Sequence, residues 1–236
     1  KFVGGAQAGY VLALAWDLVP EFQRAKLVEH LLADVKARGN QLTTGFLTTH
    51  RALIELSRAG VPADGIACET RFPALGWQVG QGATTMWERR DGFVPGRGFA
   101  DPGMNSFDHF AFGSIGEWMM GWLVGMRPDE KAPGWKHFFV APAPTEKVTH
   151  ARGAYDSIAG RVEAAWTKSN GAFELEVLVP ANTSATVVLP AAENAALTEG
   201  GAPILADSKD VRVTSRKYGK AVLEVRAGRY TFRAGA

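Results

Sequence analysis

The stretch GRVEAAWTKSNGAFELEVLV, residues 160–179, decides the fold of the second half of the chain. Polar and apolar residues alternate on both sides of Ser169-Asn170-Gly171, and Asn-Gly supplies the two positive φ angles that a type I′ turn requires. We therefore expect a β-hairpin. One strand covers Gly160–Lys168, and the other covers Phe173–Val179 and is ended by Pro180.

Further strands are expected toward the C-terminus. The same alternation predicts them at Ala185–Leu189, Val211–Thr214, Ala221–Val225 and Arg229–Phe232. Short strands at this spacing, with turn residues between them, are typical of an antiparallel β-sandwich. We assign residues 133–236 to such a domain.

The first half of the chain follows a helical period instead. Apolar residues recur at spacings of three and four, which predicts amphipathic helices. The expected helices cover 10–18, 21–38, 46–59 and 106–126, with Ser106 as the N-cap of the last. An all-α segment over 1–132 followed by an all-β segment over 133–236 indicates an α + β chain with two domains.

Composition excludes several classes of protein. The chain has 236 residues, of which 46% are hydrophobic and 21% charged, so disorder is excluded as the main state. Its net charge of +2 is spread along the chain and predicts no nucleic-acid partner. The apolar runs are too short to cross a membrane. The chain opens with Lys1 and lacks an initiator Met, so we expect it to be part of a longer protein.

Several kinds of active site have no motif in this sequence. The histidines and the single cysteine do not follow metal-ligand spacing, and phosphate-binding loops and a Gly-x-Ser-x-Gly motif are missing, so no metal and no cofactor are predicted. Cys68 is expected to be a small core residue. A functional site is instead expected in Gly76–Gly103, a long segment rich in Gly and Trp between two helices.

Glu88 is the first candidate within that segment. It follows Trp87 and precedes Arg89 and Arg90 in the stretch Gln81–Gly92. Sugar rings stack on aromatic side chains, and a carboxylate can deprotonate the water that attacks an anomeric carbon. The alternative is an ion pair between Glu88 and Arg89 or Arg90, with Trp87 packed beneath it.

His109 is the second candidate, at the start of the last expected helix. There it would be a neutral hydrogen-bond partner for a hydroxyl or a carboxylate. The alternative is that His109 packs near Trp118 or caps its own helix. Trp16, Trp118 and Trp122 lie at helical spacing and are expected in the core.

These residues belong to motifs that resemble those of the bacterial α-L-rhamnosidases of glycoside hydrolase family 78. The resemblance covers nearly the whole chain. It rests on the segments Gln81–Gly92, Ser106–Trp118, Leu42–Leu47, Val177–Thr183 and Gly228–Phe232.

The resemblance implies an (α/α)6 barrel followed by a β-sandwich, and an enzyme that releases terminal α-L-rhamnose with inversion of configuration. By the same resemblance Glu88 is the general base, His109 contacts the sugar, and Trp87 helps to form the wall of the sugar pocket. The implied substrates are rhamnosylated small molecules or polysaccharides.

Two positions depart from the pattern of the family. Arg90 stands where the family usually has Trp, and Asp108-His109-Phe110 replaces Asn-His-Tyr. The acidic stretch that holds the general acid of the family is missing, and four long helical patterns are too few for a barrel of twelve helices. We therefore expect 1–132 to be the C-terminal part of a barrel, completed by an N-terminal part or another chain.

Two other functions stay open at this point. One is a non-catalytic carbohydrate-binding or structural module. The other is a different (α/α)6 enzyme, such as a trehalase-like hydrolase or a polysaccharide lyase. Localisation cannot be predicted without the true N-terminus.

Overall fold

The chain forms two compact units, Lys1–Trp118 and Met119–Ala236, in a computed structural model. The structure describes residues 2–72, 74, 76–205 and 208–235. The division falls earlier than the expected boundary before Pro133, because residues 119–128 pack with the strands that follow. None of the described helices is long and apolar enough to span a bilayer.

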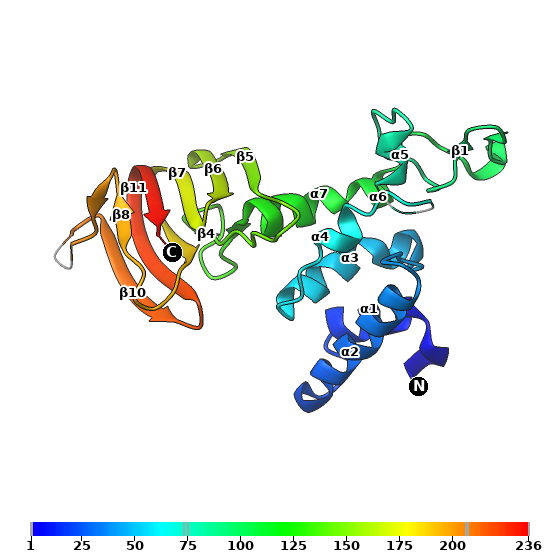
Figure 1. Ribbon diagram of the computed structural model, residues 1–236, viewed down its shortest axis with the longest axis horizontal. Coiled ribbons are helices and arrows are strands. Elements are labelled where there is room, and N and C mark those ends of the chain that lie inside the picture. Colours follow the sequence, from blue (N-terminus) through cyan, green and yellow to red (C-terminus); the bar gives the residue numbers. More distant parts are fainter. Residues whose placement is uncertain (1, 73, 75, 206–207, 236) are drawn as a thin grey trace. The chain divides into compact units, whose positions relative to one another are not determined.

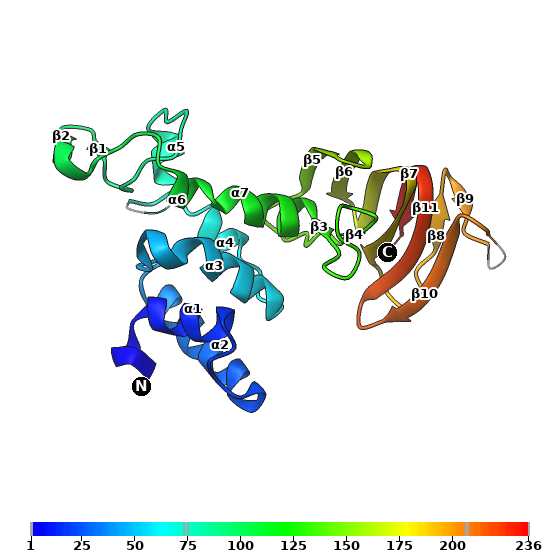
Figure 2. The ribbon, with the colours of Figure 1, turned by 180° about the vertical axis from the view of Figure 1, so that it is seen from behind.

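The first unit is helical (Figures 1 and 2). Its helices are α1 (Gln7–Ala15), α2 (Glu21–Ala37), α3 (Gly45–Arg58), α4 (Asp64–Ala67), α5 (Trp77–Gly80), α6 (Phe110–Gly113) and α7 (Ile115–Trp118), with 3-10 turns η1 (Phe2–Gly5) and η2 (Pro102–Met104). Helix α1 packs against α2 and α3, and the core includes Val11, Leu31 and Leu53. Gly39 and Gly60 adopt positive φ angles just after α2 and α3, the conformation in which glycine commonly ends a helix.

Gln7 fixes the connection between α2 and α3. Its buried side-chain amide donates to Asp34 Oδ2 at 2.8 Å and to the Gln41 carbonyl at 3.2 Å, and its oxygen accepts from Thr43 N at 2.7 Å. These bonds satisfy the buried amide and order the connection just before Phe46, which lies beside the candidate site.

The long helix expected over 106–126 is absent as such. The structure has the short helices α6 and α7, followed in the chain by the π-helix η3 (Met119–Val124). His109, and not Ser106, is the N-cap of α6. The prediction failed because His109, whose N–H donates to the Met86 carbonyl, has an extended backbone (φ −116°, ψ 113°), so no helix runs through it from Ser106.

The expected loop 76–103 also contains regular structure. Besides α5 and η2 it holds a small antiparallel pair, β1 (Phe93–Val94) and β2 (Gly98–Phe99). The rings of Phe93 and Phe99 lie 5.1 Å apart and pack the two strands together.

The second unit is built on a nine-stranded sheet (Figure 1). The strands are β3 (Met126–Pro128), β4 (His137–Val140), β5 (His150–Ser157), β6 (Gly160–Ser169), β7 (Ala172–Pro190), β8 (Leu197–Glu199), β9 (Ala202–Pro203), β10 (Val211–Lys217) and β11 (Lys220–Ala234). The expected hairpin is confirmed as β6 and β7, with positive φ at both Asn170 and Gly171.

Strand β7 corrects the prediction that Pro180 ends a strand. Residues 180–183 bulge out opposite Ala227, so Pro180 lies where no ladder partner needs its missing N–H. The strand therefore continues, and β11 likewise joins two of the predicted strands across the same bulge. Strand β4 pairs with β7 in parallel, so the sheet is mixed and not purely antiparallel.

The core of the sheet unit is formed by alternate residues of β6, β7 and β11. Trp166 is 1% exposed, and its indole N–H donates to the Leu123 carbonyl at 2.8 Å. This bond holds η3 against the sheet. Trp122, expected in the core, is half-buried and stacks 4.2 Å from the guanidinium carbon of Arg127.

Two of the residues expected in the core of the helical unit are exposed. Cys68, the C-cap of the four-residue helix α4, is exposed, whereas Ile66 in the same helix is buried. Trp16, just after α1, is 55% exposed. Trp118 is buried as predicted, and its indole N–H donates to Ser57 Oγ at 2.9 Å.

Gly125 makes the change from helix to strand possible. Its φ is +94°, its N–H donates to the Met120 carbonyl at 3.1 Å, and its own carbonyl accepts from Ala141 N at 2.9 Å. A Cβ at this position would lie 2.3 Å from the backbone nitrogen of Pro142. Only glycine fits, because both the backbone conformation and the space exclude a side chain.

We predict that Gly125→Ala lowers the free energy of unfolding by about 3 kcal/mol or more. The control is Gly219→Ala, where φ is also positive at +71° but the added methyl meets open space. That control is expected to cost only about 1 kcal/mol. Denaturant unfolding of both variants checks the prediction, and equal losses would contradict the close contact at Gly125.

Candidate active site

Two segments that are far apart in the sequence run side by side around Glu88. Glu88 N donates to the Ser106 carbonyl at 2.8 Å, and His109 N donates to the Met86 carbonyl at 2.8 Å. Thr85 Oγ1 adds a bond to the Phe107 carbonyl. The two motifs singled out in the sequence are thus held together by backbone hydrogen bonds.

The carboxylate of Glu88 is fixed at one oxygen and open at the other. Oε2 accepts a hydrogen bond from Ser106 N at 2.8 Å. Oε1 lies 3.8 Å from His109 Nε2, beyond hydrogen-bond distance, and no hydrogen bond from the described residues reaches it. The side chain is 16% exposed. Such a carboxylate is oriented by the protein and can still accept a proton.

His109 is oriented by its own helix. Its Nδ1 accepts from Ala111 N at 3.4 Å, which assigns the proton of the neutral ring to Nε2, the atom that faces Glu88. The helix-capping alternative is therefore confirmed, and it is compatible with a site role because it leaves Nε2–H available. The rings of Phe46 and Phe110 lie 6.0 and 5.4 Å from the imidazole.

Trp87 is buried beneath the site. It is 5% exposed, and its ring packs edge-on against Phe107 at 4.9 Å. Its backbone N–H donates to Oε1 of Gln78 at 2.8 Å. Gln78 was missed by sequence reasoning, since a glutamine in a four-residue helix carries no recognisable signal. Its buried amide holds the residue that precedes Glu88.

The ion pair suggested for Glu88 with Arg89 or Arg90 is not formed. Arg89 donates to both carboxylate oxygens of Asp91 at 3.0 Å, and these bonds hold the pKa of Asp91 below its ordinary value. Arg90 donates to the Leu42 carbonyl and lies 5.6 Å from the ring of Phe112. Burial lowers the pKa of the Arg90 guanidinium. The close partners of both arginines are therefore groups other than the Glu88 carboxylate.

Asn105 closes the loop that separates the two segments. Its Nδ2 donates to the Gly92 carbonyl at 2.9 Å and is 3.5 Å from the Ala100 carbonyl. This brings both ends of the β1–β2 hairpin to the start of the second segment. Within the described part of the chain, no group of three or more His, Cys, Asp or Glu side chains is arranged to hold a metal ion.

Family models match both parts of the chain. Residues 1–123 match the bacterial alpha-L-rhamnosidase 6 hairpin glycosidase domain, and residues 125–202 match the bacterial alpha-L-rhamnosidase C-terminal domain. An alpha-L-rhamnosidase of Streptomyces avermitilis is 39% identical over 193 residues, which are 81% of this chain and 18% of the relative. One of Formosa agariphila is 32% identical over 237 residues, 99% of this chain and 25% of that protein.

Solved structures show the same similarity. The Streptomyces avermitilis alpha-L-rhamnosidase, in complex with L-rhamnose, has a TM-score of 0.87 at 35% identity over 98% of this chain and 22% of that one. An alpha-L-rhamnosidase from Dictyoglumus thermophilum has a TM-score of 0.83 at 28% identity, with 98% and 25% covered. The chain thus spans between a fifth and a quarter of the length of most of these relatives.

We predict that Gln78→Leu loosens the backbone at Trp87, the residue that precedes Glu88. It leaves the buried N–H of Trp87 without its partner, which costs about 1–3 kcal/mol of unfolding free energy. Amide hydrogen exchange at Trp87 should become faster. The control is Gln81→Leu one turn later, where the side chain is half-buried and exchange at Trp87 should not change. Unchanged exchange in Gln78→Leu would contradict the anchoring role.

Proposed function

Because the chain belongs to the bacterial α-L-rhamnosidase family, we propose that it supplies the general base of an inverting α-L-rhamnosidase. The observation that carries this proposal is the carboxylate of Glu88. One of its oxygens is fixed by a backbone N–H, and the other faces the Nε2 of His109 without a hydrogen bond. The oxygen that accepts no hydrogen bond from the protein has both of its lone pairs available for the proton of a water molecule.

In the proposed reaction, Oε1 of Glu88 removes a proton from a water molecule. The water oxygen bonds to the anomeric carbon of a terminal α-L-rhamnose on the face opposite the leaving group. The bond to the glycosidic oxygen breaks, and that oxygen leaves with a proton from a general acid. The configuration at the anomeric carbon is therefore inverted.

The general acid has to come from outside this chain. In an inverting glycosidase the acid and the base stand roughly 6.5–9.5 Å apart, which leaves room for the water. We propose that the helical unit is the C-terminal part of an (α/α)6 barrel and that the rest of the barrel carries the acid. The nine-stranded sheet, in the same proposal, forms the β-sandwich that follows the barrel.

His109 is proposed to bind the sugar beside the base. Its Nε2–H can donate to a sugar hydroxyl while Nδ1 stays bonded to the backbone. Phe46 and Phe110 are 42% and 86% exposed next to it and offer apolar faces to the sugar C–H groups. Trp87, which we expected in the pocket wall, is proposed to support that wall from beneath. The substrate class is a rhamnosylated small molecule or polysaccharide.

We predict that Glu88→Gln, in the intact protein that carries this chain, lowers kcat for an aryl α-L-rhamnoside about 10²–10⁴-fold. The amide keeps the shape of the side chain and loses the ability to accept the proton. The control is Glu117→Gln, an exposed carboxylate in α7, which should keep the activity of the wild type. Near-normal turnover by Glu88→Gln in a folded protein would overturn the proposal.

A further inference from the structure

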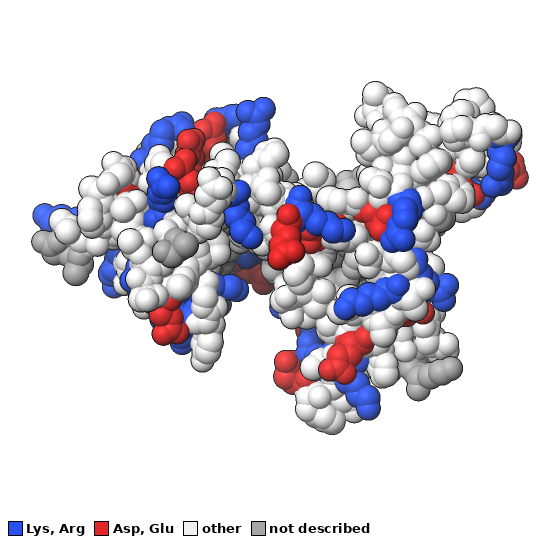
Figure 3. All heavy atoms as spheres, in the orientation of Figure 1, with Lys and Arg blue, Asp and Glu red and all other residues white. Residues whose placement is uncertain are grey.

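The outer face of the sheet unit carries a hollow that the proposed active site does not use. It lies over β5, β6, β7 and β11 and has a volume of about 370 Å³, which is in the range of about 300–1,000 Å³ typical of ligand pockets. In Figure 3, blue and red atoms lie together over β6 and β7. The residues that line it include Arg152, Arg161, Glu163, Ala165, Glu176 and Arg229.

The register of the strands explains the hollow. Arg152 on β5 lies opposite Ala165 on β6, which lies opposite Glu176 on β7. Two strand spacings place the Cα atoms of Arg152 and Glu176 about 10 Å apart. Because only the methyl group of Ala165 stands between them, the space above it is open.

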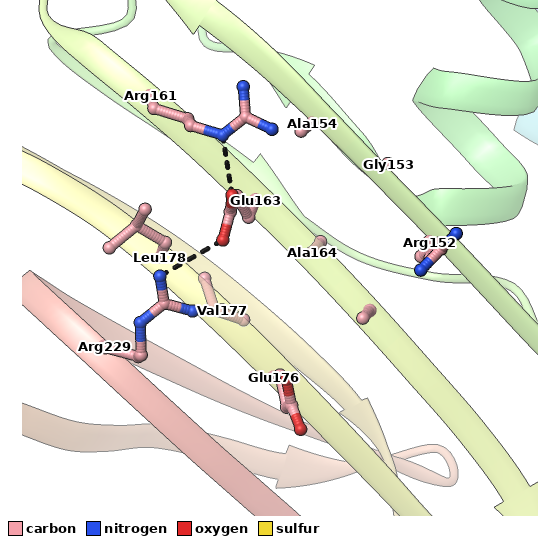
Figure 4. A pocket seen from close by; sticks show the side chains of 11 residues that line it. Arg152, Gly153, Ala154, Arg161, Glu163, Ala164, Glu176, Val177, Leu178 and Arg229 are labelled. Atoms are coloured by element: carbon pink, nitrogen blue, oxygen red, sulfur yellow. Dashed lines mark hydrogen bonds and ion pairs between the residues drawn. The ribbon is translucent and has the colours of Figure 1, made fainter.

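One side of the hollow is held in a fixed geometry. Glu163 accepts from Arg161 at 2.6 Å and from Arg229 at 3.2 Å, and Arg161 also donates to Asp156 at 2.9 Å. Figure 4 shows Glu163 bonded to Arg161 and Arg229, with Arg152 and Glu176 standing apart from these three residues. No hydrogen bond or ion pair within the described residues engages either Arg152 or Glu176, so a donor and an acceptor remain available.

The balance of charges points to an uncharged ligand. This hollow and the adjoining hollow described below are lined by three arginines (Arg152, Arg161 and Arg229) and three glutamates (Glu163, Glu174 and Glu176), so the two hollows together have no formal net charge. An anion or a cation would meet as much repulsion as attraction here. A neutral ligand that carries many hydroxyl groups can instead accept from the guanidinium and donate to the carboxylate at the same time.

A second hollow continues the first. It has a volume of about 510 Å³ and shares Arg152, Ala165 and Glu176 with its neighbour. Its far side is lined by Met120 and Leu123 from η3. The two hollows together form a groove that is polar at one end and apolar at the other, which suits a chain of sugar units with hydroxyl and C–H faces.

We propose that this groove is a second saccharide site, in the sheet unit, which binds a neutral part of a rhamnose-containing polysaccharide. The choice of a polysaccharide rests on the proposed function, because a rhamnosidase would meet such chains. In this site Arg152 donates to sugar hydroxyls, Glu176 accepts from them, and Ala165 forms the floor.

The test uses affinity gel electrophoresis of the intact protein in gels that contain a neutral rhamnan. A Glu88→Gln background prevents degradation of the polymer. Arg152→Met combined with Glu176→Gln should raise the dissociation constant for rhamnan about tenfold or more, since charge-assisted hydrogen bonds are lost. Ala165→Trp fills the hollow and should have the same effect without a change of charge. The control, Arg212→Met on the exposed part of β10, should bind as the parent does.

The outcomes separate this site from the proposed function. Hydrolysis of an aryl α-L-rhamnoside, measured without the Glu88→Gln change, should be the same with and without the groove substitutions. Loss of rhamnan binding in the groove variants supports the site, even if the protein hydrolyses no rhamnoside. Rhamnan binding that is unchanged in both groove variants overturns it, as does retardation by anionic polygalacturonate in place of rhamnan.

Discussion

The pairing of residues 85–88 with residues 106–109 is the constraint on which the candidate site depends. Two main-chain hydrogen bonds hold the two segments together, from Glu88 N to the Ser106 carbonyl and from His109 N to the Met86 carbonyl, and the bond from Ser106 N to the Glu88 carboxylate adds to them. This pairing places the imidazole of His109 next to the carboxylate of Glu88. His109, which is held by this pairing, has an extended backbone (φ −116°, ψ 113°), and α6 begins at the next residue, Phe110. The same pairing thus accompanies both the start of α6 and the position of His109 beside Glu88.

The fold could be predicted where one local pattern decides the structure. Helices α2 and α3 begin and end close to the predicted residues, since proline and glycine mark their ends. The β6–β7 hairpin follows from Asn170-Gly171. Predictions failed where a distant partner decides. Pro180 was read as a strand end, although a bulge opposite Ala227 lets β7 continue. The parallel pairing of β4 with β7 has no signal in either strand alone.

The candidate site was predictable only in part for a similar reason. Glu88 and His109 stand in motifs that can be read along the chain. Gln78, Asn105 and Phe46 support or flank them through contacts between segments, which a linear pattern does not reveal. Helical spacing also gave a wrong prediction for Trp16, which was expected in the core and is exposed. The helix ends at Ala15, so the spacing no longer determines the direction of the next side chain.

The central claim is that Glu88 activates water and does more than hold the fold. Azide is a small nucleophile that needs no base, so it can replace the water when the carboxylate is removed. The direct test adds sodium azide to the Glu88→Ala variant of the intact protein, with an aryl α-L-rhamnoside as substrate. We expect turnover to return and the product to be the β-configured rhamnosyl azide. No rescue in a folded variant, or an α-configured product, would contradict the account.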